Sequence, residues 1–421
     1  MHKKDKSWWF FALILAIFGT VVYFLMQQGS AIDVALHRSG ATGTLGTLEL
    51  FRNLTLHNLM EPAAMILLQI IAILIVSRVF SSLFAKIQQP TVIGEILAGI
   101  VLGPSLLGMV FPGAYSFLFS PESLDNLYII SQIGLVLFMF TIGMELNMSE
   151  LKDKLKNTFI ISQSSIVVPF MLGMILAMVI YRDYSPPDSN FTSFALFIGI
   201  SMSITAFPVL ARIVQEKGLS KTHLGTISIG SAAINDVTAW LLLVAVIAIA
   251  QTGSLASSAY TLLFTGIYIA LMLFVVRPFL KRIGAIYQKE ELMNKSIFGF
   301  FILMLIISAY TTQLLGIHAL FGAFMAGLIM PPMPRFRKLM VDKIEDLSVS
   351  LLLPLFFVYT GLKTEIGLLN TPSLWMLCLV FIAVAVVGKL GGSAIPARAI
   401  GESWKDSLSL GVLMNTRGLM E

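Results

Sequence analysis

The stretch Gly94-Glu-Ile-Leu-Ala-Gly-Ile-Val-Leu-Gly-Pro104 occurs a second time as Gly322-Ala-Phe-Met-Ala-Gly-Leu-Ile-Met-Pro-Pro332. Both copies have Gly, Ala, Gly and Pro in the same register. Self-similarity of this kind indicates a chain built from two related halves. A second match follows each copy, in which Leu137-Phe138 and Gly143 correspond to Leu355-Phe356 and Gly361.

The composition excludes an ordinary soluble domain. Of the 421 residues, 57% are hydrophobic and only 12% are charged, whereas soluble domains carry roughly 25% charged residues. Apolar runs long enough to span a bilayer recur from Trp8 almost to the C-terminus. The sequence therefore predicts an all-α polytopic membrane protein of about 13 helices, near 8–27, 61–77, 90–110, 126–144, 157–181, 191–211, 223–250, 258–276, 296–314, 317–332, 347–362, 373–397 and 406–421.

The positive charges predict how these helices are oriented. Most of the 28 lysines and arginines fall on one side of the membrane if the N-terminus is cytoplasmic. Topology thus explains the net charge of +5, and no nucleic-acid partner is implied. We expect a multi-pass protein of the cell inner (plasma) membrane. The helix near 258–276 stands between the two halves and gives them opposite orientations.

We divide the chain into four parts. Residues 1–58 form an N-terminal anchor helix and an outside linker, because the first apolar run is too long for a signal peptide and lacks an A-x-A cleavage site. Residues 59–250 form the first repeat of six helices, 251–290 a linking helix with a cytoplasmic loop, and 291–421 the second repeat. The second repeat is expected to lack its last helix. The one cysteine, Cys378, excludes an internal disulfide and a thiolate metal site, and no cofactor is expected.

Each half contains one apolar run that is interrupted by residues unfavourable to a helix. The interruptions are Thr205-Ala206-Phe207-Pro208 and Asn415-Thr416-Arg417-Gly418. Pro208 removes a backbone donor and clashes with the preceding turn, which frees carbonyls that a polar cavity or a partner must satisfy. A single proline kink is common in membrane helices, but paired interruptions in inverted halves are typical of alternating-access transporters. We therefore expect two crossed discontinuous helices that meet near the midplane.

Asp236 lies in the middle of an apolar run and is the strongest site candidate. An Asp at the bilayer centre costs roughly 2.5–3.5 kcal/mol, so such residues usually serve a function. A carboxylate there can hold a proton or a hard monovalent cation, and burial favours the first while a bound cation favours the carboxylate. This competition predicts exchange of Na+ or K+ for H+. The alternative is an Asp that only hydrogen-bonds to a neighbouring helix. Further oxygen ligands are expected from Asn235, Thr205 and Ser203.

Two basic residues fall within apolar runs, Lys389 near the end of its run and Arg417 in the second interruption. Lys389 and Arg417 could each neutralise the negative C-terminal end of a half-helix at the crossing. Lys389 could instead pair with Asp236 or Asn235, or extend to the cytoplasmic interface. Arg417, next to Gly418, is expected to hold the crossing together and to contact no cation.

Two further ionisable residues are weaker candidates. His318 opens the short helix near 317–332 and could respond to pH near neutrality, although a structural role is the simpler interpretation. Glu95 lies in the first copy of the repeated stretch, where a role in an entry funnel and a role in packing are equally compatible with the sequence.

The motifs together resemble the monovalent cation:proton antiporter-2 family, in particular its plant-type cation/H+ exchanger and Kef-like members. The resemblance runs from about Leu59 to the end and rests on residues 89–104, 203–212, 316–324 and 415–418 and on Asn235-Asp236. It implies the Na+/H+ antiporter fold, a homodimer, and a core domain that moves against a dimerisation domain. It also implies that Asp236 binds cation and proton, that Asn235 goes with electroneutral exchange, and that Lys389 is the basic residue opposite this pair.

Three functions remain open at this point. The first is a secondary active transporter that exchanges Na+ or K+ for H+ by alternating access. The second is a Kef-like gated K+ efflux system or a cation channel, which shares the cavity but needs no strict coupling. The third is a sodium-coupled solute symporter, which would need a cluster of polar recognition residues beside Asp236. The sequence contains no hydrolytic or redox constellation, so an enzyme is not expected.

Overall fold

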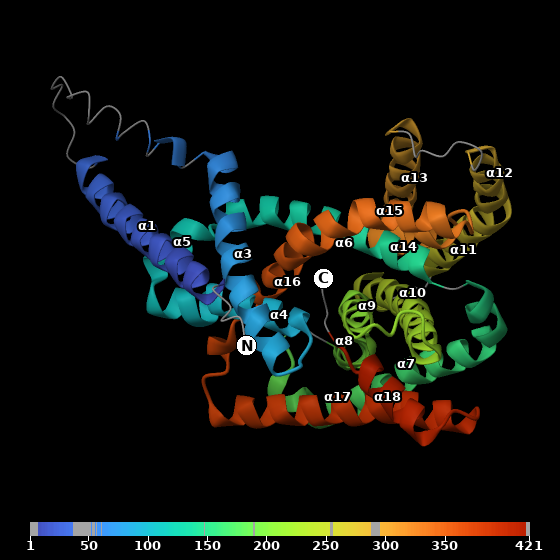
Figure 1. The fold of residues 1–421 in the computed structure, drawn as a ribbon. Coiled ribbons are helices and arrows are strands. Elements are labelled where there is room, and N and C mark those ends of the chain that lie inside the picture. The colour runs from blue at the N-terminus through green and yellow to red at the C-terminus, as the bar shows by residue number, and fades with distance from the viewer. Residues whose placement is uncertain are drawn as a thin grey trace, which may run out of the picture.

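The computed structural model describes residues 7–36, 52, 55, 57–59, 61–146, 148–187, 190–252, 256–287 and 295–417. All regular elements within these residues are helical (Figure 1). The α-helices are α1 (Ser7–Leu36), α3 (Pro62–Lys86), α4 (Thr91–Leu102), α5 (Pro112–Leu118), α6 (Pro121–Glu145), α7 (Met148–Tyr184), α8 (Phe191–Ser203), α9 (Phe207–Glu216), α10 (His223–Thr252), α11 (Ala256–Leu271), α12 (Arg277–Tyr287), α13 (Lys295–Leu314), α14 (Ala319–Leu328), α15 (Pro334–Leu347), α16 (Leu353–Leu362), α17 (Pro372–Ala399) and α18 (Trp404–Met414). Short π-helical or 3-10 turns are η1 (Pro104–Gly108), η2 (Met272–Val276), η3 (Ser348–Leu352) and η4 (Ile366–Leu368).

The helices have the length and the surface of membrane spans. Ten helical stretches among the described residues are long and apolar enough to cross a bilayer, and Leu13–Leu25 and Ala319–Leu328 are apolar but shorter. Large apolar side chains are exposed on their outer faces, as at Phe274 and Val179, which suits contact with lipid. The all-helical polytopic class is thus confirmed, with ten such spans in place of the expected thirteen.

Several boundaries differ from the expected ones. The run at 191–211 is divided into α8 and α9, and the run at 90–110 ends as α4 at Leu102 before Pro104 opens η1. The first helix continues to Leu36, beyond the expected end at 27, and most of the expected linker lies outside the described residues. Three helices were not expected, the short α5, the charged α12 and the amphipathic α15. Charged helices such as α12 and α15 resemble loops in a search for apolar runs.

The helices pack into two bundles. Bundle 1 contains α3, α4, α6 and α13–α16, and bundle 2 contains α7–α10, α17 and α18. In Figure 1, α17 and α18 lie with α7–α10 in the lower part, and α14, α15 and α16 lie above them with α6. Each bundle takes helices from both halves of the chain, so neither half is a separate folding unit.

Close glycine contacts hold bundle 1 together at two places. Gly99 of α4 meets Gly361 of α16, and a Cβ atom at Gly99 would lie 2.1 Å from a carbonyl oxygen of α16. Gly327 of α14 meets α6 beside Gly143, and a Cβ there would also lie 2.1 Å from a carbonyl oxygen. Small residues allow such close approach of membrane helices. Because the repeat pairs Gly99 with Gly327 and Gly361 with Gly143, the two contacts occupy equivalent positions in the two halves.

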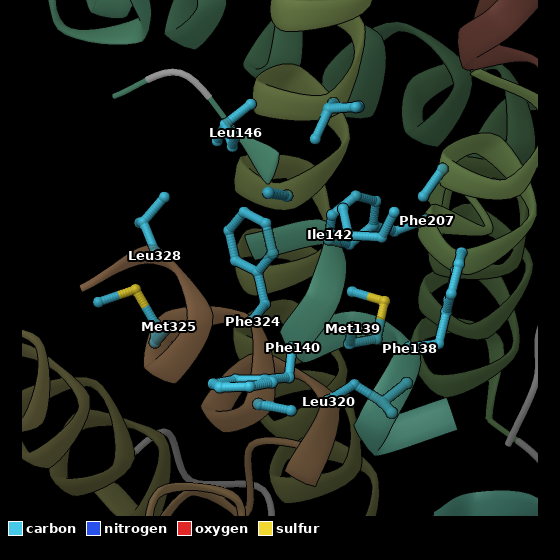
Figure 2. Packing of buried hydrophobic residues seen from close by; sticks show 14 of the residues in the cluster. Phe138, Met139, Phe140, Ile142, Leu146, Phe207, Leu320, Phe324, Met325 and Leu328 are labelled. Atoms are coloured by element: carbon cyan, nitrogen blue, oxygen red, sulfur yellow. The ribbon is translucent and has the colours of Figure 1, made fainter. Parts of the chain in front are cut away.

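The boundary between the bundles is apolar near the centre of the molecule. Figure 2 shows Phe207, at the start of α9, beside Ile142 and Met139 of α6, with Phe324 of α14 near them. The ring centroids of Phe207 and Phe324 are 5.2 Å apart and the rings stand edge to face at 81°, a favourable aromatic geometry. Bundle 2 therefore meets bundle 1 through side chains of the helix that begins at the first interruption.

Candidate cation and proton site

The first interruption separates α8 from α9 at residues 204–206. Ala206 is the N-cap of α9, and Pro208 lies in its first turn, where a missing N–H disrupts no helical hydrogen bond. Pro208 thus fits a helix that starts anew, which is a better description than a kinked continuous helix. The backbone groups of the break must then find partners outside α8 and α9.

The second interruption supplies one of these partners. The Ala206 N–H donates a 2.9 Å hydrogen bond to the carbonyl oxygen of Thr416. Helix α18 ends at Met414, and Asn415 is its C-cap. The two expected interruptions therefore meet in space. Gly418, the last residue expected in this motif, lies outside the described residues.

Asn235 also stabilises the break. Its side-chain oxygen accepts a 3.2 Å hydrogen bond from the Thr205 N–H, and its amide group donates a 3.0 Å hydrogen bond to the Ser165 hydroxyl. Asn235 is fully buried, so both bonds replace hydration that the folded chain excludes. The geometry gives Asn235 the role of holding the backbone of the interruption, which the sequence did not indicate.

Asp236 lines a small cavity at the break. The cavity has a volume of about 50 Å³, room for a few water molecules at roughly 10–15 Å³ each on this measure. Asp236 is buried, with 7% of its surface exposed. The hydroxyl oxygen of Thr205 is buried at the same cavity and makes no hydrogen bond within the described residues. The lining residues are Gln132, Leu135, Ile204, Thr205, Ala206, Phe207, Pro208, Asp236, Ala239, Trp240, Leu243, His318, Leu320 and Phe356.

Ser203 and Lys389 lie behind the break. The Ser203 hydroxyl donates to the carbonyl oxygens of Gly199 and Ile166, and Ser203 is not among the residues that line the cavity. The Lys389 ammonium donates to the Ser203 carbonyl oxygen. Lys389 is completely buried, which contradicts the interpretation that it extends to the membrane interface. Its contact places a positive charge at the C-terminal end of α8, where the helix dipole is negative.

Arg417 binds the same helix end. Its guanidinium donates to the carbonyl oxygens of Met202, at 2.6 Å, and of Ala385, and to the Asn415 side chain at 3.1 Å. These contacts join the second interruption to α8 and α17.

His318 reaches the cavity from bundle 1. It is the N-cap of α14, and its Nδ1 atom accepts from the Leu320 N–H at 3.4 Å. Its ring stacks on Trp240 of α10, with centroids 5.8 Å apart and planes at 17°. His318 therefore caps α14, and its ring also contacts bundle 2 at the cavity.

Glu95 lies away from the cavity, near the far end of α9. It is buried on α4, and the charges that act on it most strongly are those of Arg212, Glu216 and Arg78. It is not among the cavity residues. Its position is compatible with an entrance on that side or with packing, and it is not part of the group around Asp236.

Polar contacts at the end of α9 connect the two bundles, and we call them the α9 latch. The Glu216 carboxylate accepts from the Thr91 N–H at 2.8 Å and from the Thr91 hydroxyl, and it pairs with Arg212 at 2.8 Å. The Lys217 ammonium donates to the Gln88 carbonyl at 2.8 Å, and the Gln215 amide donates to Glu345 at 2.6 Å. The latch consists of Gln88, Thr91, Arg212, Gln215, Glu216, Lys217 and Glu345.

Arg337, near the start of α15, is a residue that no sequence motif singled out. Its guanidinium donates to the carbonyl oxygens of Met144 at 2.6 Å, Met330 at 2.8 Å, Pro331 at 3.1 Å and Leu328 at 3.4 Å. These carbonyls lie at or just beyond the C-terminal ends of α6 and α14, where backbone acceptors have no partner within the helix. Nothing in the sequence distinguishes Arg337 from its basic neighbours.

The comparisons with known proteins agree with this geometry. The family described as "Sodium/hydrogen exchanger, transmembrane" matches residues 70–421. The Na(+)/H(+) antiporter NhaS4 of Synechocystis sp. is 43% identical over 358 residues, which cover 85% of this chain and 87% of that protein. Cation/H(+) antiporter 17 of Arabidopsis thaliana is 36% identical over 85% of this chain, and K(+)/H(+) antiporter 1 of Saccharomyces cerevisiae is 30% identical over 87%. The chain spans about 43% of the length of each of these last two.

A solved structure shows the same fold. The sodium proton antiporter MjNhaP1 from Methanocaldococcus jannaschii superposes with a TM-score of 0.61 over 84% of this chain and 83% of its own, at 14% sequence identity. This likeness concerns the fold, and the sequence matches carry the family assignment. The chain belongs to the sodium/hydrogen exchanger family and is a membrane cation/proton antiporter, which confirms the transporter class expected from the sequence and excludes an enzyme.

Proposed function

We propose that the chain exchanges Na+ or K+ for H+ at Asp236 by alternating access. The observation that carries this proposal is the cavity at the helix break, where the buried Asp236 carboxylate and the buried Thr205 hydroxyl line the same space. Carboxylate, hydroxyl and carbonyl oxygens are the ligands that hard cations prefer. Half-helix ends that face such a cavity are typical of secondary transporters.

One carboxylate can account for the coupling. A proton neutralises Asp236, and a monovalent cation beside the carboxylate gives the same net charge. The empty buried carboxylate is unfavourable, so replacement of one occupant by the other is the favoured step. Asn235 adds no second charge, and its oxygen already accepts from Thr205. The loaded site therefore carries the same charge in both directions, which favours one-for-one, electroneutral exchange.

The two bundles supply a route to alternating access. Asp236 and Thr205 belong to bundle 2, and their cavity is completed by residues of bundle 1. A displacement of bundle 2 along the apolar boundary at Phe207 would carry the site from one side to the other. The equivalent glycine contacts of the two halves support an inverted repeat, which provides two arrangements of similar energy.

The orientation and assembly are part of the same proposal. The charge distribution supports a cytoplasmic N-terminus in the inner membrane, and the family resemblance supports a homodimer. The accessibility of single cysteines introduced near Lys338 and Lys363, in a Cys378→Ser background, to a membrane-impermeant maleimide tests the orientation. Labelling of Lys338→Cys from outside intact cells would contradict it.

Reconstitution tests the function directly. In proteoliposomes with an internal pH dye, an imposed Na+ or K+ gradient should drive proton movement that saturates with cation concentration and is insensitive to membrane potential. Asp236→Ala should abolish it, and Asp125→Ala, an exposed acid at the start of α6, should leave it unchanged. Retained exchange in Asp236→Ala would reject the site, and non-saturating currents would favour a channel.

A further inference from the structure

Gln132 is a polar side chain that bundle 1 presents to the cavity. It lies on α6, is partly buried, and lines the cavity together with Asp236 and Thr205. Within the part of the chain that the structure describes, its carboxamide makes no hydrogen bond. A half-buried amide without a protein partner needs water or a ligand to satisfy it.

The face of α6 that carries Gln132 lies along the cavity that Asp236 lines. Leu135 lines the same cavity, and Met139 lines a smaller adjoining space that Asp236 also borders. Residues three and seven positions apart share one face of a helix, so Gln132 and the two apolar residues form one stripe against bundle 2. On this stripe, Gln132 alone offers an oxygen.

Among the described residues, no other side chain on the bundle 1 side of the cavity offers an oxygen ligand. On the bundle 1 side of the cavity, the other polar side chain is His318, whose Nδ1 atom is used at the N-cap of α14 and whose ring stacks on Trp240. The remaining bundle 1 lining is apolar, as at Leu320 and Phe356. A cation at Asp236 would therefore receive its ligands from bundle 2, from water, and from Gln132.

We propose that Gln132 is a cation-positioning residue, whose side-chain oxygen replaces one water ligand of the monovalent cation held at Asp236. This inference rests on the proposed function. Because Gln132 and Asp236 belong to different bundles, the amide contributes in the arrangement described here and is withdrawn when the bundles are displaced. Ligand number and cavity size decide between cations of equal charge, so Gln132 affects both affinity and preference.

The test compares variants of the full chain in proteoliposomes with Li+, Na+, K+ and Rb+. Gln132→Leu keeps the size and removes the oxygen, and it is expected to raise the KM for the preferred cation about two- to tenfold, the equivalent of one net hydrogen bond. The ratio of kcat/KM between the preferred cation and the next should shrink by a similar factor, with kcat changed less than KM. Gln132→Glu keeps an oxygen ligand and should bind the preferred cation at least as tightly as the wild type.

A matched control separates this role from a structural one. Asn126→Leu makes the same amide-to-apolar change at an exposed position of the same helix and should alter neither the KM nor the preference. Cation-dependent thermal stabilisation of the purified chain gives the same comparison without turnover, since a ligand stabilises the folded state that binds it. There, the half-effective cation concentration should rise by the same factor in Gln132→Leu.

Two results would overturn the inference. One is a Gln132→Leu chain whose KM, half-effective concentration and cation preference match those of Asn126→Leu. The other is a Gln132→Glu chain that loses affinity as Gln132→Leu does. If the wild type shows neither exchange nor stabilisation by any alkali cation, or if Asp236→Ala still exchanges, then the proposed function itself fails. If only the Gln132 variants behave like their control, this inference fails while the proposed site at Asp236 stands.

Discussion

The Ala206 N–H donates to the carbonyl oxygen of Thr416 at 2.9 Å, which joins the interruption after α8 to the residues after α18. Each interruption thereby satisfies a backbone group that the other leaves without a helical partner. The breaks are products of tertiary structure as much as of Pro208. The side chains that hold this junction should therefore matter as much as those that face the cavity.

Asn235 is the first of these side chains. Asn235→Ala removes the acceptor of the Thr205 N–H and the donor to Ser165, and we expect it to lower the stability by about 1–3 kcal/mol because buried groups lose their partners. Asn235→Asp keeps the acceptor of the Thr205 N–H and should lower the stability less than Asn235→Ala does. Thermal unfolding in detergent measures both, and equal stability of Asn235→Ala and the wild type would contradict the assigned role.

Arg337 should be irreplaceable by lysine. Its planar fork reaches four carbonyl oxygens at the ends of α6 and α14, and an ammonium group cannot match that geometry. We expect Arg337→Lys to lower the unfolding free energy by about 1.5–3 kcal/mol. Arg335→Lys, at an exposed position of the same helix, is the control and should have almost no effect. A similar loss in both variants would show that a general effect of replacing arginine by lysine in this helix, and not the capping of α6 and α14, is responsible.

The glycine contacts predict equal effects in the two halves. Gly99→Ala and Gly327→Ala each place a Cβ atom 2.1 Å from a backbone oxygen, so a helix must shift, at a cost of about 1–3 kcal/mol. Gly299→Ala meets open space and should be neutral. The yield and thermal stability of the three purified variants test this. A large effect in one repeat copy and none in the other would contradict the equivalence of the two contacts.

A covalent bridge across the α9 latch should stop transport. In a Cys378→Ser background, Thr91→Cys with Glu216→Cys places two thiols on residues that contact each other across the bundles. If the bundles move, oxidation should abolish exchange, and a reductant should restore it.

The control for this bridge lies within bundle 1. Ser105 and Thr364 contact each other at the end of α4 and after α16, so a bridge between cysteines at these positions should leave exchange unchanged. If the oxidised variant with Thr91→Cys and Glu216→Cys exchanges at an undiminished rate, bundle displacement is rejected as the mechanism of access.

The sequence predicted the helical class and singled out Asp236 as the site candidate, because both inferences depend on local signals. Asp236 is conspicuous in an apolar run, and Pro208 marks a break wherever the helix packs. The meeting of the two interruptions could be inferred only because the repeat linked them.

The sequence could not predict which way a polar side chain points. Ser203 carries a hydroxyl as Thr205 does, yet the first bonds to its own helix and the second lines the cavity. Gln132 lies in a helix with apolar residues on every side, so no amphipathic stripe shows that it lines the cavity of Asp236. Arg337 caps helices that lie far from it in the chain, which only the packed structure can show.

The edge-to-face contact of Phe207 with Phe324 has a consequence for the rate at which the bundles can be displaced. Bundle 2 can be displaced along this apolar boundary at low cost. Each van der Waals contact that is lost is replaced by another, and no hydrogen bond is broken there. Resistance to sliding then resides in the few polar links at the remote end of α9. Substitutions in the α9 latch could therefore change the turnover rate without altering the cavity that Asp236 lines.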